Sequence, residues 1–432
     1  MSETIFSLST GGLPSGVAVI RMSGTGTRFA FETICGSVPE PRQARYCVFR
    51  DPAGDPIDRG LAIYFAGPSS FTGEDCGEFH LHGSRAVVAR MNAVLAGLEG
   101  FRQAEAGEFT RQAFANGKMD LTEVEGLADL LSAETEIQRR AALDQAGGHL
   151  RQIYEGWMAR LTYARAMLEA DFDFADEEDV PGSVAHGIWT DIESLQMEIQ
   201  GHLDGVKWGE AIRDGFRIAL IGAPNAGKST LLNRLADRDV AIVSAQPGTT
   251  RDSIEVRLDI AGHLVRLFDT AGLRDTDDEV ETEGIRRSLS MAEGADLVLL
   301  LDDGASPAPP VPDHIPYRRV DTKSDLRTNF VPEGLWLSAK TGEGIRDLIE
   351  WIANELSNRS ASVVGLPNRA RHESLLRQTV SRIEAALQAR ELGAEVAAAE
   401  LHAAAGSLGE ITGKVGVEQL LGVIFSQFCI GK

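Results

Sequence analysis

The chain has 432 residues, 43% of them hydrophobic, and a formal net charge of −22. Its length predicts about three domains, each with enough apolar content for a packed core. The acidic balance excludes a surface that coats nucleic acid generally, because phosphate binding requires clustered Lys and Arg, although RNA held at one local basic patch stays open. No apolar run reaches about 18 residues, no basic segment precedes an apolar stretch at the N-terminus, and the four cysteines lie far apart. These features predict a reduced, cytoplasmic protein that does not span a membrane.

Residues 1–117 combine short β-rich runs with Gly and Pro turns. Runs at 17–22 and 60–65 are strand-like, and residues 78–82 alternate as a half-buried strand does. The two histidines of the last run could form a metal pair, but local hydrogen bonding is the commoner role at this spacing. The pattern predicts a compact α+β domain.

Residues 118–212 contain few Gly or Pro, and apolar residues recur there at helical spacing. This stripe predicts a long amphipathic helix that packs against neighbouring helices. An acidic run at 171–179 could chelate a cation, although a solvated loop is the commoner role of such a run. The stripe comprises Leu150, Ile153, Trp157, Leu161, Ala164 and Leu168.

Residues 213–358 alternate strands with helices, which is typical of a parallel sheet. A Pro-rich stretch at 304–312 interrupts the alternation and must be a loop. Residues 359–432 return to Ala-, Leu- and Glu-rich helix, so we expect an α/β domain inserted into one helical domain. The candidate strands are residues 216–221, 265–268, 297–301 and 334–337.

Residues 222–229 fit the phosphate-binding pattern G-x-x-x-x-G-K-[ST]. A predicted strand precedes them and a predicted helix follows, which is the context that the pattern requires. The glycines permit unusual backbone conformations, so that N–H groups and the helix N-terminus face phosphate oxygens. Lys228 would reach the terminal phosphates, and the hydroxyl of Ser229 would hold Mg²⁺. The alternative is a Gly-rich turn with a chance Lys-Ser.

Two later segments have the order and spacing of switch loops. In residues 248–252, a threonine can give its hydroxyl to magnesium and its N–H to the terminal phosphate. Asp269 directly follows a predicted strand and would hold the metal through water. The N–H of Gly272 would contact the terminal phosphate, and loss of that contact on hydrolysis would release the loop.

Two further segments predict guanine recognition. Asp325 can accept two N–H donors from guanine, a pair that adenine cannot supply, and residues 338–340 would close the base pocket. The base motif usually opens with Asn, which ties it to the phosphate-binding loop, whereas this chain has Thr322 with its shorter hydroxyl. We therefore expect GTP specificity with weaker affinity. These segments, in this order, predict a Ras-like GTPase domain with a mostly parallel sheet.

Catalysis in this domain must differ from that in small regulatory GTPases, which place Gln after the D-x-x-G glycine to orient water. Here Leu273 stands at that position and cannot hydrogen-bond water. The carboxylates of residues 275–281 could serve instead, although a solvated acidic loop is the ordinary role of most of them. The side-chain oxygen of Asn225 could hold a monovalent cation that replaces an arginine finger.

Together these motifs resemble the MnmE (TrmE) family of tRNA uridine-modification GTPases, and the resemblance covers essentially the whole chain. The family implies a folate-binding-like α+β domain, followed by a helical domain that carries an inserted GTPase domain. The motifs are the phosphate-binding loop with Asn225, residues 248–252 and 269–274, the segments 70–75 and 116–121, and the C-terminal residues 428–432.

The resemblance also implies roles for individual residues. Arg21, Glu78, Lys118 and Lys432 would bind 5-formyl- or methylene-tetrahydrofolate, although each taken singly is more ordinarily a surface charge. Glu281 matches the catalytic glutamate of the second switch. Cys429 becomes a candidate participant in uridine modification, and a tail cysteine without chemical consequence is the alternative. Magnesium would be held by Ser229 and Thr250, and potassium by Asn225, Ser244, Gln246 and Thr249. The predicted nucleotide-binding residues are Asn225, Ala226, Gly227, Lys228, Ser229, Thr230, Ser244, Thr249, Thr250, Asp269, Gly272, Thr322, Lys323, Asp325, Ser338, Ala339 and Lys340.

The implied function is GTP-dependent installation of an aminomethyl or carboxymethylaminomethyl group at C5 of a tRNA wobble uridine. The implied partners are tRNA, a second copy of the chain whose GTPase domain dimerises in potassium, and a flavin-dependent MnmG-type protein that forms a heterotetramer. A GTP-switched ribosome-assembly or RNA-binding factor is the alternative, and the acidic surface does not favour it. A folate enzyme with a vestigial GTPase is a third option, which the intact nucleotide motifs disfavour.

Overall fold

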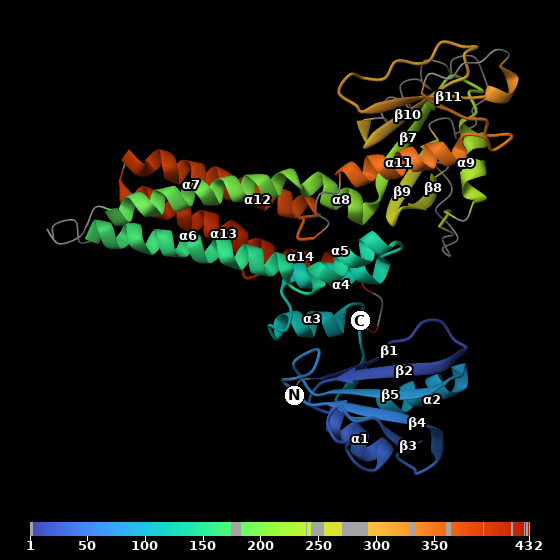
Figure 1. The fold of residues 1–432 in the computed structure, drawn as a ribbon. Coiled ribbons are helices and arrows are strands. Elements are labelled where there is room, and N and C mark those ends of the chain that lie inside the picture. The colour runs from blue at the N-terminus through green and yellow to red at the C-terminus, as the bar shows by residue number, and fades with distance from the viewer. Residues whose placement is uncertain are drawn as a thin grey trace. The chain divides into compact units, whose positions relative to one another are not determined.

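The structure, a computed structural model, divides the chain into two units. The N-terminal unit consists of Met1–Ala128 and Gly409–Lys432, and the central unit is Asp129–Leu408. Figure 1 shows the ribbon with its elements labelled. The residues that the structure describes are 3–173, 183–238, 240–242, 255–269, 293–327, 334–359, 364–391, 393–415, 418–426, 428 and 431.

The N-terminal unit begins with the elements β1 (Thr4–Leu8), β2 (Ser15–Ser23), α1 (Thr27–Cys35), β3 (Arg45–Arg50), β4 (Pro56–Phe65), β5 (Cys76–Gly83), α2 (Arg85–Ala96) and β6 (Phe101–Gln103). The strands form one sheet in the order β3-β4-β5-β2-β1-β6. Its neighbouring strands are antiparallel except β1 and β6, which are parallel. This sheet lies where the sequence predicts an α+β domain.

The alternation of side chains between the two faces of β2 and β5 explains the core of this unit. Ile20 and Met22 of β2 and Phe79 of β5 are fully buried, and they pack with Phe31 of α1 and Met91 of α2. The intervening residues of each strand face the other side of the sheet, because side chains alternate along a strand. One face of the sheet therefore holds the main core, and the other face carries polar side chains together with a smaller cluster of Ile5, Ala104 and Phe109.

Three helices complete the N-terminal unit: α3 (Glu108–Ala115), α4 (Leu121–Ser132), which continues into the central unit, and α14 (Glu418–Ser426). Val124 of α4 is buried against Phe425 of α14 and against Phe428. The C-terminal segment therefore belongs to the core of the N-terminal unit, although nearly the whole chain separates it from β1.

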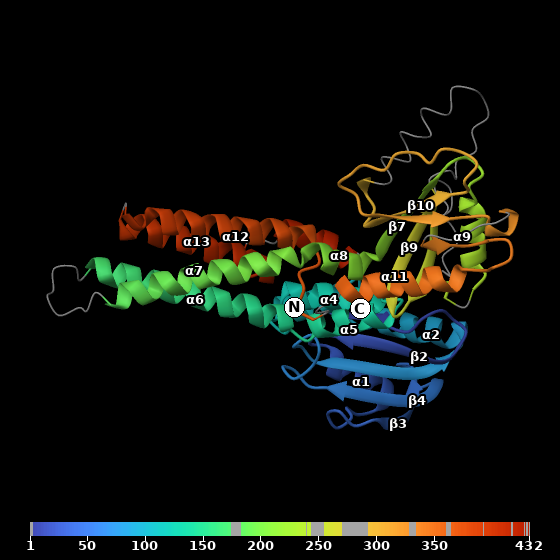
Figure 2. The ribbon, with the colours of Figure 1, turned by 45° about the horizontal axis from the view of Figure 1, so that its top comes forward.

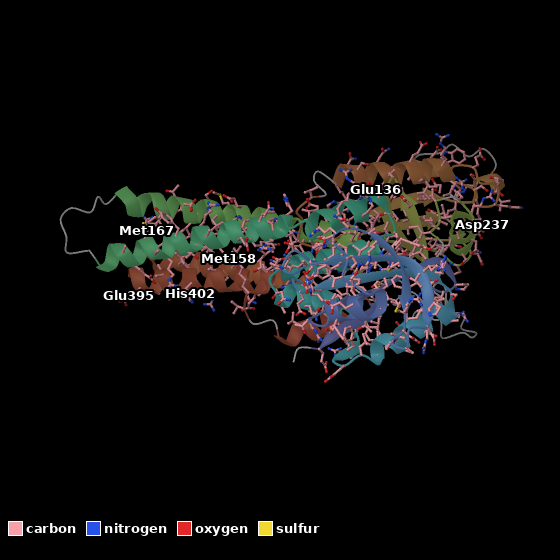
Figure 3. The ribbon with its side chains drawn as sticks, turned by 90° about the horizontal axis from the view of Figure 1, so that it is seen from below. Glu136, Met158, Met167, Asp237, Glu395 and His402 are labelled. Carbon is pink, nitrogen blue, oxygen red and sulfur yellow. The ribbon has the colours of Figure 1, made fainter. Side chains whose placement is uncertain are left out.

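The central unit contains the helices α5 (Glu136–Ala146), α6 (His149–Asp173), α7 (Ser183–Asp204), α8 (Val206–Asp214), α12 (Ala370–Gln388), the short 3₁₀ turn η2 (Ala389–Glu391) and α13 (Ala394–Thr412). The long helices α6, α7, α12 and α13 run alongside one another (Figure 1, Figure 2). The predicted stripe of α6 is buried except for Ile153, which is half-buried. Polar contacts link the helices at their surface, and His402 of α13 accepts a hydrogen bond of 2.8 Å from Arg165 of α6 (Figure 3).

The sheet of the central unit is built from β7 (Phe216–Gly222), β8 (Glu255–Ile260), β9 (His263–Asp269), β10 (Leu297–Asp302), β11 (Tyr317–Asp321) and β12 (Leu335–Trp336), with the helices α9 (Lys228–Ala236) and α11 (Ile345–Arg359) and the 3₁₀ turn η1 (Ser324–Leu326). Its order is β12-β11-β10-β7-β9-β8, and β8 alone runs antiparallel to its neighbour. Ile218 and Leu220 of β7 pack on one face, and Ala219 and Ile221 pack on the other. Burial on both faces explains why these strands are continuous apolar runs.

The sheet of the central unit contacts the helical part of the same unit through α5. Glu136, labelled in Figure 3, begins that helix. The backbone N–H of Ile137 donates to the carbonyl oxygen of Gly262 between β8 and β9 at 3.0 Å. Arg257 of β8 forms an ion pair with Glu134 at 3.1 Å. The two parts of the central unit are thus joined by side-chain and backbone contacts as well as by the chain itself.

The predicted fold class is confirmed: an α+β N-terminal domain, a helical region and a Ras-like domain with a mostly parallel sheet. Each predicted strand falls within an observed strand or overlaps one. Within the described part of the chain, no helix has both the length and the apolar character needed to cross a membrane. The proposed domain boundaries at 117/118, 212/213 and 358/359 stay predictions.

Candidate functional site

The phosphate-binding loop connects β7 to α9 and owes its shape to left-handed backbone at two positions. Gly227 has φ +99°, a value that residues with a Cβ rarely adopt, and Asn225 has φ +63° with an exposed side chain. Gly222 is required for another reason: a Cβ there would lie 2.6 Å from the carbonyl oxygen of Leu301. The backbone N–H of Ala226 closes the turn on the carbonyl oxygen of Ala223 at 3.0 Å. The sequence pattern has therefore folded into a strand–turn–helix loop.

Lys228 lies beneath this loop and is 7% exposed. Its Nζ donates to the carbonyl oxygens of Gly222 and Ala223 at 2.7 and 3.1 Å. Burial lowers the pKa of Lys228, and the nearby carboxylate of Asp269 opposes that effect. The ammonium group is therefore fixed inside the loop, at the helix N-terminus where phosphate oxygens are favoured.

Ser229 and Asp269 meet at the start of α9 and the end of β9. The Ser229 hydroxyl donates to Oδ2 of Asp269 at 2.7 Å, and Asp269 is 1% exposed. The two residues come from segments that are far apart in sequence, and parallel pairing of β7 with β9 brings them together. A hydroxyl and a carboxylate at this edge are the oxygen donors that suit Mg²⁺. Thr230, the next residue of α9, is exposed.

Thr322 ties the base-recognition segment to the phosphate-binding loop. Its hydroxyl donates to the carbonyl oxygen of Ala226 at 2.8 Å, and its side chain is buried. Its backbone N–H donates to the carbonyl oxygen of Asp302 at 2.8 Å, which continues the register of β10 with β11. The threonine therefore makes the connection for which an asparagine is usual, through one hydroxyl hydrogen bond worth about 1 kcal/mol.

The remaining base-recognition residues form two connected pairs. The hydroxyl of Ser338 donates to Oδ1 of Asp325 at 2.6 Å, which fixes the carboxylate that would accept from guanine. Lys323 has φ +56° and pairs with Asp303 at 2.8 Å, and this pairing lowers the pKa of Asp303. Asp303 is a partner that the motif analysis missed, because it follows β10 rather than the base motif. Ala339 and Lys340 follow Ser338 in the same loop, the first half-buried and the second exposed.

A second group of predicted residues lies in the N-terminal unit. Arg21 of β2 and Glu78 of β5 are directly opposite in the antiparallel register, and the guanidinium donates to Oε1 of Glu78 from Nε at 3.2 Å and from Nη2 at 3.0 Å. His80 contacts Oε2 of Glu78 at 3.1 Å. The hydrogen bond with His80 and the charge of Arg21 lower the pKa of Glu78, against the effect of burial. His82 instead pairs with Asp58 at 2.9 Å, so each histidine has its own carboxylate.

Aromatic side chains flank this pair. The rings of Phe71 and Phe109 each lie 6.0 Å from the guanidinium carbon of Arg21. Phe109 is buried and Phe71 is 42% exposed, so one ring fixes the cation while the other is open to solvent. Lys118, the third predicted folate residue, donates to the carbonyl oxygen of Pro68 at 2.9 Å. His80 and the two rings were missed, although the alternation of residues 78–82 places His80 on the same strand face as Glu78.

Gly431, near the C-terminus, lies beside the end of β1. The hydroxyl of Ser9 donates to the carbonyl oxygen of Gly431 at 3.0 Å, and Gly431 has φ +96°. A Cβ at Gly431 would lie 2.4 Å from the carbonyl oxygen of Leu8, so glycine is required there.

Several predicted site residues lie outside the described part of the chain: Ser244, Gln246, Thr249, Thr250, Gly272, Glu281, Cys429 and Lys432, together with Leu273 and most of the acidic run at 171–179.

Two family models match the sequence along nearly its full length. The model described as "MnmE helical domain" matches residues 121–429, and the model described as "GTP-binding protein TrmE N-terminus" matches residues 4–118. The chain belongs to the MnmE family. The resemblance inferred from the nucleotide motifs and the C-terminal segment is thereby confirmed.

Curated relatives extend the match. The tRNA modification GTPase MnmE of Brucella anthropi is 52% identical over 438 residues, which cover 100% of this chain and 99% of the relative. The protein of the same name from Brucella suis biovar 1 is 52% identical over 436 residues, with coverages of 100% and 98%. Among solved structures, Era of Aquifex aeolicus bound to GDP and AlF₄⁻ is 24% identical, covers 32% of this chain and 56% of that chain, and has a TM-score of 0.26.

Proposed function

We propose that this GTPase, together with a flavin-dependent MnmG-type partner, installs an aminomethyl or carboxymethylaminomethyl group at C5 of the wobble uridine of certain tRNAs. The observation that carries the proposal is the 52% identity to a tRNA modification GTPase along the full chain, which includes both candidate sites. A nucleotide-binding domain alone would fit many GTP-dependent activities. The pairing of Arg21 with Glu78 in a separate unit supports a second, substrate-directed site.

The residues of the phosphate-binding loop fit GTP with magnesium. Lys228 would release its two carbonyl contacts to meet the terminal phosphates, and the backbone N–H groups before α9 would bind their oxygens. Ser229 and Thr250 would hold the metal directly and Asp269 would hold it through water. Bound magnesium would supply charge neutralisation on the transferred phosphoryl group. Asp325, oriented by Ser338, would select guanine.

Asn225 is the residue that we assign to potassium. Its side chain is exposed at the outer turn of the loop, so an additional ligand set can reach it. Ser244, Gln246 and Thr249 of the first switch would complete that set, and the two GTPase domains of a homodimer would meet there. Hydrolysis should then be faster in potassium than in sodium, and equal rates would remove the potassium assignment.

The Arg21–Glu78 pair keeps hydrogen-bonding capacity for a folate. A carboxylate offers about four acceptor sites, and Arg21 and His80 occupy three of them at Glu78. One site on Oε2 is left for a pterin N–H donor. Arg21, Lys118 and Lys432 would provide cations for the folate carboxylates, and the exposed ring of Phe71 would provide a stacking surface. We assign 5-formyl- or methylene-tetrahydrofolate to this site on these grounds.

The remaining parts of the proposal concern Cys429 and the partners. Cys429, three residues from Lys432, would take part in uridine modification as a reduced thiol. The homodimer would bind two copies of the flavin-dependent partner as a heterotetramer, and a tRNA substrate places the protein in the cytoplasm. Cys429→Ser should abolish modification and leave GTP hydrolysis unchanged, and normal modified tRNA in that variant would make the thiol a tail residue without chemical role.

Mass analysis of wobble uridines is the decisive experiment. Cells that lack the protein should accumulate unmodified wobble uridine, and the wild-type chain should restore the modification whereas Lys228→Ala should not. Lys207→Ala, which changes an exposed lysine of α8, is the matched control and should restore it fully. Normal wobble uridines together with defective ribosomal subunits in the deleted cells would overturn the proposal in favour of a ribosome-assembly factor.

A further inference from the structure

Two cysteines lie together at one edge of the N-terminal sheet, outside both candidate sites. Cys35 is the last residue of α1, and Cys47 lies within β3. The chain turns back at Gly36, which has φ +79°, and so brings β3 against the end of the helix. Both side chains pack against the same core of the sheet, the two thiols are electrostatically coupled neighbours, and both are free and partly exposed.

Arg45 is held next to the two sulfurs by the turn itself. Its Nη1 donates to the hydroxyl of Ser37 at 2.6 Å, and its Nη2 donates to the carbonyl oxygens of Ser37 and Cys35 at 2.7 and 3.3 Å. Its Nε is buried without a hydrogen-bond partner among the described residues. A thiolate beside this guanidinium would supply the missing acceptor, so the arginine favours an ionised sulfur here.

The surroundings shift the pKa values of the two thiols in opposite directions. The hydrogen bond from Cys35 and the charge of Arg45 lower the pKa of Cys47 to about 7, against the effect of burial. The hydrogen bond to Cys47 and burial raise the pKa of Cys35. At neutral pH a large fraction of Cys47 is therefore a nucleophilic thiolate, and Cys35 stays a thiol positioned to react with it.

The position of the pair in the fold leaves it accessible. β3 is the terminal strand of the sheet and pairs with β4 alone. Cys76 offers a contrast in the same unit, because it is 4% exposed and its sulfur contacts the hydroxyls of Thr72 and Ser23. Proximity, ionisation and access thus coincide at the Cys35–Cys47 pair, whereas burial protects Cys76.

We propose that Cys35 and Cys47 are a redox modification site that hydrogen peroxide closes to a reversible disulfide. The Cys47 thiolate attacks a peroxide oxygen, the O–O bond breaks, and the departing hydroxide takes a proton to leave as water. Cys47 is then a sulfenic acid. The sulfur of Cys35 attacks the Cys47 sulfur, the S–O bond breaks, and the second oxygen leaves as water with the thiol proton. Two thiols lose two electrons in total, and one peroxide becomes two water molecules.

The disulfide would join the C-terminus of α1 to the edge strand and would leave the nucleotide-binding residues untouched. The inference does not depend on the proposed tRNA function, since it involves neither candidate site. Dithiothreitol would restore the two thiols by exchange.

The test treats the reduced full-length chain with hydrogen peroxide, unfolds it in denaturant, blocks remaining thiols with N-ethylmaleimide and identifies peptides by mass spectrometry. We expect a cross-linked pair of peptides containing Cys35 and Cys47, which disappears after dithiothreitol, while Cys76 is recovered alkylated. Cys35→Ser should leave a sulfenic acid at Cys47 that dimedone traps, and Cys47→Ser should leave Cys35 largely unreacted. Far-ultraviolet circular dichroism should show that both variants keep the wild-type fold.

A substitution at the arginine separates proximity from activation. Arg45→Gln should slow disulfide formation several-fold at neutral pH, because the thiolate fraction of Cys47 falls. Arg50→Gln is the matched control, since Arg50 is an exposed arginine of the same strand whose guanidinium donates to the carbonyl oxygen of Gly54. This variant should leave the rate unchanged. Equal oxidation of Cys76, or alkylation of both Cys35 and Cys47 after peroxide, would overturn the proposal.

Discussion

The two sheets of this protein hold their candidate sites in different ways. In the GTPase sheet, Ser229 lies in the first turn of α9 and Asp325 in η1, just beyond parallel strands whose carboxyl ends meet at one edge. In the N-terminal sheet, Arg21 and Glu78 lie within antiparallel strands and face each other across the ladder. The first site is assembled by loops and the second by strand register.

This difference decides how each site appears in a sequence. Loop residues of the phosphate-binding site are contiguous, because one loop supplies the lysine, the serine and the backbone donors together. Residues 21 and 78 carry no local motif, and their ion pair of 3.0 Å exists only because β2 and β5 pair in one register. A one-residue slip would turn Glu78 to the other face of its sheet, whereas the residues within the phosphate-binding loop stay together because they are contiguous in the chain.

Lys228→Ala tests the loop site most severely. Removal of the buried ammonium should reduce GTP hydrolysis by about 100-fold or more, since a preorganised charge at the phosphates is lost. Phosphate release would measure the rate of hydrolysis, and equilibrium fluorescence would measure nucleotide binding. Lys207→Ala should match the wild type, and near-normal hydrolysis in Lys228→Ala would show that the loop has another role.

Glu281→Ala separates catalysis from binding within the same domain. We expect turnover to fall by about 100-fold, the range of a lost general base, with little change in GTP affinity. Single-turnover hydrolysis and a binding titration give the two quantities separately. If affinity instead fell in parallel with turnover, Glu281 would be a structural residue of the second switch.

Thr322→Val tests the connection between two loops. The valine keeps the shape and leaves the carbonyl oxygen of Ala226 without its buried donor, so GTP affinity should fall by about 10-fold and stability by about 1–3 kcal/mol. Thr379→Val is the matched control, since that hydroxyl donates to the carbonyl oxygen of Leu375 in α12, also at 2.8 Å and also buried. The control should lose similar stability and keep its GTP affinity. Unchanged affinity in Thr322→Val would show that the connection is dispensable.

Glu78→Gln tests the strand site through its pH dependence. The folded pKa of Glu78 lies below its ordinary value of 4.5, so the pair contributes stability above that pH and loses it as the pH falls through the folded pKa. Because the pair is partly exposed, the contribution should be below about 1 kcal/mol. Urea unfolding of the wild type and variant at neutral and acidic pH measures the difference. The exposed Glu99→Gln serves as the control, and a variant that loses stability in acid as the wild type does would refute the link to Glu78.

Sequence alone determined the fold class, the nucleotide motifs and the buried stripe of α6, because each depends on residues close together in the chain. It placed Asp269 and Ser229 in one metal-binding pattern, which stays a prediction, and the structure added the 2.7 Å contact between them. It identified Thr322 as unusual but could not say that its hydroxyl still reaches Ala226, since that depends on how β11 aligns with β7 through β10.

Only the tertiary structure decided which carboxylate pairs with each histidine and which two cysteines are neighbours. His80 joins Glu78 while His82 joins Asp58, although both histidines occupy the same strand. Cys35 and Cys47 appeared to be isolated cysteines in the sequence, and the packing of α1 and β3 against one core makes their thiols neighbours. The physical reason is common to both cases: chain periodicity fixes the face on which a side chain lies, and strand pairing and turns fix which side chain stands opposite.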